Sequence, residues 1–109
     1  MDEPKRQRPR LLSAGELERA MSSLAAWRLE GGRLVRDLEF PSFAEAMRFV
    51  HRAAEEAERM DHHPDMLISY RRVTLTLWSH DAGGATWRDL ELASRLDAAA
   101  AAQGKAGGS

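Results

Sequence analysis

Apolar positions recur along the chain with a helical period in three stretches, and these stretches predict three α-helices. The first is expected at about residues 13–24, because Ser13 is a good N-cap and Glu16 follows three residues later as in a capping box. A longer helix is expected over 42–61, with apolar residues on one face and charged residues on the other. A third begins after Thr86 and continues into an alanine-rich run.

Four β-rich segments lie between these helices and pair naturally into two hairpins. The predicted strands are residues 27–30, 33–40, 66–70 and 73–79. Gly31 and Gly32 join the first two, and glycines supply the positive φ angles that a two-residue turn requires. The second turn is expected at Arg71–Arg72, although neither arginine is a typical turn residue.

The element order α-β-β-α-β-β-α predicts an α+β fold, with a four-stranded antiparallel sheet and three helices packed on one face. The other face of such a sheet would be bare, so we expect a homodimer or homotetramer. The globular domain is expected over 11–98. Residues 1–10 read as a disordered N-terminal arm, and residues 99–109 as the end of the last helix followed by a flexible tail.

Composition narrows the function classes. A chain of 109 residues fits one domain, and the absence of cysteine excludes disulfides, thiol catalysis and cysteine-bound zinc. A net charge of -1 gives no reason to expect a nucleic-acid or membrane partner. The N-terminus lacks the apolar core of a signal peptide, so a cytoplasmic location is expected.

Three of the four histidines form the candidate chemical site. His62 and His63 precede Pro64, which disfavours helical geometry at the residue before it, and His80 follows the last strand. Imidazole has an ordinary pKa near neutrality, so such a cluster suits proton transfer. A solvated helix cap remains an alternative. A metal site is a weaker one, because adjacent residues in extended chain point in opposite directions, and we expect no metal.

The spacing of these residues resembles the pterin-4a-carbinolamine dehydratase family. The pattern is an acidic residue, a His-His-Pro step, an aromatic residue, a third histidine and a later aspartate. The matching positions are Glu58, His62, His63, Pro64, Tyr70, His80 and Asp89. Trp27, Phe40 with Phe43, and residues 89–93 extend the resemblance over about 11–98.

The resemblance implies a 4a-hydroxytetrahydrobiopterin dehydratase that eliminates water from the 4a-carbinolamine of a tetrahydropterin. The product is the quinonoid dihydropterin, which restores the cofactor of aromatic amino acid hydroxylases, and the enzyme itself uses no cofactor. By this resemblance His62 and His80 transfer protons and His63 binds and orients the pterin. Asp89 either fixes a histidine tautomer or holds the pterin edge, and Glu58 either orients His62 or is a solvated helix carboxylate.

The roles of two aromatic residues are left open, and so is a second function. Tyr70 and Trp27 are candidates for stacking on the pterin ring, but an aromatic residue in a sheet is more often core. Some relatives act as a dimerisation partner of a transcription factor or as an assembly aid, so a protein-binding module is the alternative to an enzyme.

Overall fold

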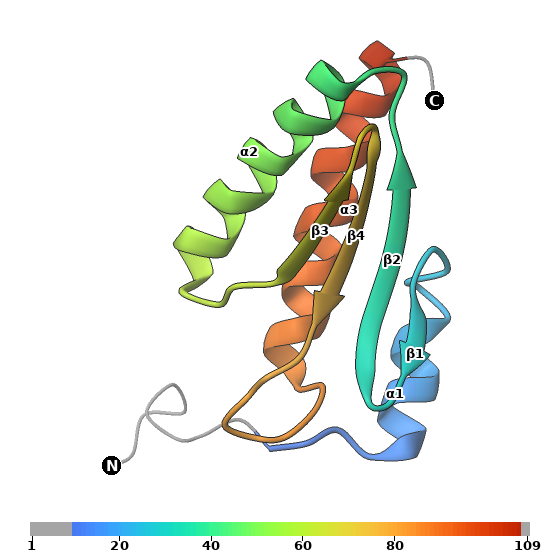
Figure 1. Ribbon diagram of the computed structural model, residues 1–109. Coiled ribbons are helices and arrows are strands. Elements are labelled where there is room, and N and C mark those ends of the chain that lie inside the picture. Colours follow the sequence, from blue (N-terminus) through green and yellow to red (C-terminus); the bar gives the residue numbers. More distant parts are fainter. Residues whose placement is uncertain (1–9, 108–109) are drawn as a thin grey trace.

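The computed structural model describes residues 10–107 and confirms the predicted order of elements and the antiparallel sheet (Figure 1). The elements are α1 (Ala14–Met21), β1 (Arg28–Glu30), β2 (Arg33–Glu39), α2 (Phe43–Met60), β3 (Asp65–Ser69), β4 (Arg72–Leu77) and α3 (Trp87–Gly107).

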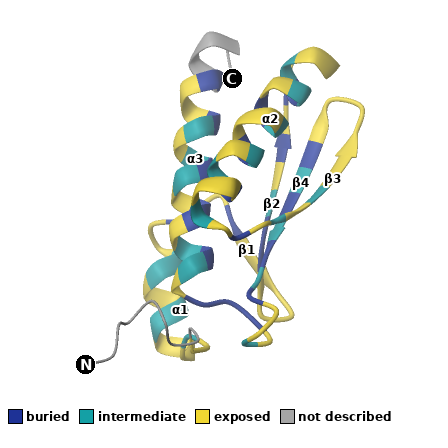
Figure 2. Ribbon diagram, turned by 90° about the vertical axis from the view of Figure 1, so that its left-hand side faces the viewer, coloured by how far each residue is buried: buried dark blue, intermediate teal, exposed yellow. Residues whose placement is uncertain are grey.

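The strands lie in the order β1-β2-β4-β3, and every neighbouring pair is antiparallel. Helices α2 and α3 lie side by side over one face of this sheet, and the other face is open (Figures 1 and 2). Val73, Leu75 and Leu77 of β4 alternate inward and are fully buried in the core cluster, together with Phe49 of α2 and Leu92 of α3. The helices therefore cover the apolar face that the alternation predicts.

The structure confirms the predicted position of the first hairpin turn and corrects that of the second. Gly31 and Gly32 both have positive φ, as predicted for the first turn. The second turn was predicted one residue too late, since Ser69 pairs with Arg72 and the turn consists of Tyr70 and Arg71. The alternation of buried and partly buried residues along β4 favours this register, and Tyr70 adopts a φ of 57° to close the turn.

Helix ends differ from the prediction mainly at α1 and α3. Helix α1 stops at Met21, earlier than expected, and its capping box between Ser13 and Glu16 is present. Helix α3 passes through the alanine-rich run, as expected, and continues as far as Gly107. The buried side chain of Gln103 donates to the backbone carbonyl of Glu45 at 2.6 Å, which fastens this late part of α3 to the start of α2.

A short segment before α1 closes the loop that follows β4. The backbone N–H of Leu12 donates to the carbonyl of Ala85 (3.1 Å), and the N–H of Ala85 donates to the carbonyl of Gly32 (3.0 Å). A Cβ atom on Gly84 would lie 2.8 Å from the Cδ2 atom of Leu11, so glycine is what lets this leucine approach. The loop is thus held on two sides.

The predicted N-terminal arm falls outside the described residues except for Arg10, whose guanidinium bonds both carboxylate oxygens of Glu16. Between residues 10 and 107 no helix has the length and apolarity needed to cross a bilayer.

Candidate active site

The two histidine-bearing segments lie at the same end of the sheet. Helix α2 ends at a residue in the left-handed conformation, and the backbone N–H of His62 then donates to the carbonyl of Ala57 at 3.0 Å. The chain enters β3 at Asp65, which pairs with Thr76 close to the end of β4. His80 follows β4 at this same end (Figure 1).

His62 belongs to a buried polar network that joins the end of α2 to the start of α3. Its Nε2 atom lies 2.6 Å from Oδ1 of Asp89. The other carboxylate oxygen, Oδ2, accepts from the Ser79 hydroxyl (2.9 Å) and from the backbone N–H of Thr86 (2.8 Å). The hydroxyls of Ser79 and Thr86 are 2.8 Å apart, and all four residues are buried.

The hydrogen-bond pattern around Asp89 assigns the protons. A carboxylate only accepts, so His62 donates through Nε2–H and Ser79 donates through its single hydroxyl hydrogen. The hydroxyl of Thr86 must then donate to Ser79. A neutral His62 consequently carries its lone pair on Nδ1, where it can accept a proton.

His63 makes a similar contact at the surface. Its Nε2 atom is 2.6 Å from Oε2 of Glu58, and both side chains are exposed. The sequence analysis gave Glu58 as a candidate to orient His62, but in the structure its carboxylate contacts His63. The carboxylate that contacts His62 comes from α3 instead.

His80 is exposed and stacks on Trp78, with ring centroids 3.8 Å apart and an angle of 29° between the planes. The guanidinium carbon of Arg33 lies 3.8 Å from the centroid of the Trp78 ring. Trp78 was not predicted as a site residue. Its signal was present in the alternation, because residues two apart in a strand point to the same side.

Two predicted aromatic residues do not join the histidines. Trp27 is buried in the core, and its indole N–H donates to Oδ1 of Asp97 at 2.8 Å. Tyr70 is exposed in the turn at the opposite end of β3 from His63. Trp27 is therefore part of the scaffold, and Tyr70 lies away from the end of the sheet that carries the histidines.

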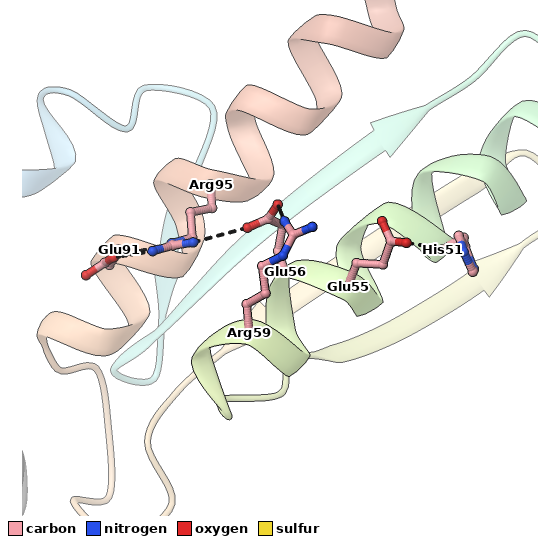
Figure 3. A network of polar contacts seen from close by, with 6 residues as sticks. All are labelled: His51, Glu55, Glu56, Arg59, Glu91 and Arg95. Carbon is pink, nitrogen blue, oxygen red and sulfur yellow. Dashed lines mark hydrogen bonds and ion pairs between the residues drawn. The ribbon is translucent and has the colours of Figure 1, made fainter.

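The remaining histidine lies in a separate surface network on α2 and α3 (Figure 3). His51 is exposed, and its Nε2 atom lies 3.6 Å from Oε2 of Glu55. In the same view Arg95 of α3 bonds Glu91 and reaches across to Glu56 of α2. Hydrogen bonds from its guanidinium to these carboxylates raise the pKa of Arg95.

Among residues 10–107, no three potential metal ligands gather closely enough to hold an ion.

Comparison with known proteins gives a consistent result. The family model described as pterin 4 alpha carbinolamine dehydratase matches residues 10–99. A Koribacter versatilis protein provisionally named a pterin-4-alpha-carbinolamine dehydratase is 49% identical over 86 residues, which are 79% of this chain and 92% of its own. A protein of the same provisional name from Acidobacterium capsulatum is 47% identical over 87 residues, covering 80% of this chain and 95% of its own.

Solved structures agree on the fold. A crystal structure described as a transcriptional coactivator/pterin dehydratase from Brucella melitensis has a TM-score of 0.79 and 34% identity, covering 82% of this chain and 97% of that one. A pterin dehydratase-like protein identified as a RuBisCO assembly factor in the alpha-carboxysome has a TM-score of 0.57 at 23% identity, covering 68% of this chain and 86% of that one. The second likeness concerns the fold alone.

Proposed function

Because the chain belongs to the pterin 4 alpha carbinolamine dehydratase family, we propose that it eliminates water from the 4a-carbinolamine of a tetrahydropterin to give the quinonoid dihydropterin. The observation that carries this proposal is the buried bond between His62 and Asp89. It supplies an imidazole of fixed tautomer beside a sheet end that bears two further histidines. The proposed product would return to the cofactor cycle of an aromatic amino acid hydroxylase.

The reaction needs one proton delivered and one removed. In our proposal Nδ1 of His62 takes the proton from a ring nitrogen of the pterin, since Asp89 holds the hydrogen on Nε2. The electrons of that N–H bond form the new C=N bond as the C4a–O bond breaks. His80 protonates the departing hydroxyl, which leaves as water. Positioned acid–base groups accelerate such steps by about 10² to 10⁴.

His63 and Glu58 receive a binding role in this proposal. Their side chains are exposed at the end of α2 and in the segment that follows it, where they can orient a ring that lies against the sheet end. No organic cofactor or metal is consumed or regenerated in the elimination. A chelator is therefore expected to leave turnover unchanged.

The test is loss of the carbinolamine ultraviolet signature on mixing with purified protein. His62→Ala and His80→Ala are each expected to lower turnover by about tenfold or more with the fold intact. His51→Ala, which replaces an exposed histidine outside the site, is the matched control. If both active-site variants keep full activity, the assignment of roles is wrong. If the wild-type protein does not accelerate the reaction, the dehydratase proposal fails.

A protein-binding role is the second candidate, and the hairpin of β3 and β4 favours it. Leu67 and Tyr70 are both more than half exposed there, at 67% and 69%. Large exposed apolar side chains often mark contact surfaces. A pull-down that finds one stoichiometric partner, together with no dehydratase activity, would put this role first.

The same surface supports the proposal of a homodimer or homotetramer, which light scattering tests directly. A cytoplasmic location completes the proposal, because a chain without cysteine needs no oxidising compartment.

A further inference from the structure

We propose that Ser79 is a positioning residue that holds His62 and the His80 loop in one common arrangement. This inference rests on the proposed dehydratase function, because it assigns Ser79 a part in the same proton transfer. Ser79 is almost completely buried, and it lies next to His80 in the chain. Its backbone and its side chain make separate sets of hydrogen bonds, and each set reaches a different histidine segment.

The backbone of Ser79 closes the loop that begins with His80. Its N–H donates to the carbonyl of Gly84 at 2.9 Å, and the two residues form an isolated β-bridge. Its carbonyl accepts from the N–H groups of Ala82 (3.1 Å) and Gly83 (2.9 Å). The geometry of the His80 loop is therefore built on the main chain of this one residue.

The side chain of Ser79 points the other way, toward the helices. Its hydroxyl donates to Oδ2 of Asp89 at 2.9 Å and accepts from the hydroxyl of Thr86 at 2.8 Å. Oδ1 of the same carboxylate holds Nε2 of His62. His80 stacks outward on Trp78 instead, as alternation along an extended chain requires. Ser79 is thus bonded to both segments.

Removing the hydroxyl separates the two sets of bonds. The main-chain bonds that shape the His80 loop do not depend on the side chain, so the loop should persist. Asp89 would lose one of its three donors, and the hydroxyl of Thr86 would lose its acceptor. The carboxylate is then held by two donors instead of three, and the tautomer of His62 is less firmly set. We expect an effect on turnover rather than on substrate binding.

The experiment compares Ser79→Ala with Ser79→Thr. The control is Ser69→Ala, which makes the same change at the end of β3 that lies away from the histidines. Ser79→Ala is expected to lower kcat by about tenfold with little change in KM, since a hydrogen bond to a charged group is lost. Ser79→Thr keeps the hydroxyl and should restore most of kcat, and Ser69→Ala should equal the wild type.

The second measurement does not require activity. Nitrogen-15 NMR of the imidazole rings should show His62 as the Nε2–H tautomer in the wild type and in Ser79→Thr, and as a tautomer mixture in Ser79→Ala. If the alanine variant does not fold, Ser79→Cys keeps the shape with a weak donor and should show the same mixture.

Two results would overturn the proposal. One is a folded Ser79→Ala protein with wild-type kcat and unchanged His62 ring signals. The other is a folded Ser79→Thr protein as impaired as Ser79→Ala, because packing rather than the hydroxyl would then be responsible. An inactive wild-type protein would refute the dehydratase function instead, and the ring signals would still decide whether Ser79 positions His62.

Discussion

His62 and His63 are adjacent in the chain and make the same contact in different surroundings. In each, Nε2 lies 2.6 Å from a carboxylate oxygen, of Asp89 for the first and of Glu58 for the second. The side chains of the first pair are 9% and 0% exposed, and those of the second are 54% and 75% exposed. The distance alone therefore does not distinguish a fixed pair from a loose one.

Burial and the additional partners make the difference. Asp89 can stay buried because Ser79 and Thr86 also donate to it, and a carboxylate without partners would be very unfavourable there. Within residues 10–107 no further donor bonds the carboxylate of Glu58, so water competes for both partners and salt screens their attraction. We infer that the first pair fixes the orientation of a ring, whereas the second is adjustable.

The largest expected effect on stability comes from replacing the carboxylate of each pair with an amide. Asp89→Asn should lower the free energy of unfolding by about 3 kcal/mol, because one accepting oxygen becomes an amide NH2 group that cannot accept from the buried donors facing it. Glu58→Gln should lower it by less than about 1 kcal/mol. Urea denaturation of both variants measures this. Equal losses in the two variants would mean that burial does not separate the pairs.

Two helix N-caps test the same comparison, with an expected loss of stability of intermediate size. Thr86→Ala and Ser42→Ala each remove an N-cap hydroxyl and should each cost about 1 kcal/mol in thermal or urea unfolding. Only Thr86 belongs to the network around Asp89, so only Thr86→Ala should alter the imidazole signals of His62. Altered signals in Ser42→Ala would contradict this separation.

A double-mutant cycle on the exposed pair should give a coupling energy smaller than the losses of stability above. The coupling energy between His63 and Glu58 is expected to be about 0.5 kcal/mol at low salt and close to zero in about 1 M salt. The cycle is measured by urea unfolding at both salt concentrations. A coupling that persists in high salt would show that this pair is as firmly held as the buried one.

The smallest effect concerns another exposed carboxylate, at the start of α1. The guanidinium of Arg10 lowers the pKa of Glu16 from 4.5 to about 2, with help from the backbone N–H of Ser13. The folded state therefore gains stability from Glu16 above pH 4.5, and this gain is lost as the pH falls toward 2. Glu16→Gln should flatten the pH dependence of stability in this range, measured by thermal unfolding. An unchanged slope would show that the ion pair does not form in solution.

Most of the fold could be predicted from the sequence because the period of its apolar residues changes clearly from element to element. Gly31 and Gly32 also marked the first turn directly. The second turn could not be located to the residue, since Tyr70 adopts positive φ without belonging to a residue type that favours it. The exact end of α3 could not be predicted, because the partner that anchors Gln103 is 58 residues away in the chain.

Less of the candidate site than of the fold could be predicted from the sequence. The spacing of motif residues identified His62 and Asp89, and one of the two roles considered for Asp89 was the histidine contact that the structure shows. Helical spacing suggested that Glu58 would reach His62, but the left-handed residue at the end of α2 redirects the chain and brings His63 to it. Ser79 carried no signal, because its role depends on contacts between distant segments.

The glycine at position 84 has a practical consequence for anyone who shortens this protein. A chain that began at Ser13 would retain every helix and strand, yet it would lose Leu11, which fills the space above that glycine, and the backbone donor of Leu12. The stretch after His80 would then be open to water on that side. Residues that precede all regular structure therefore take part in shaping the end of the molecule that carries His80.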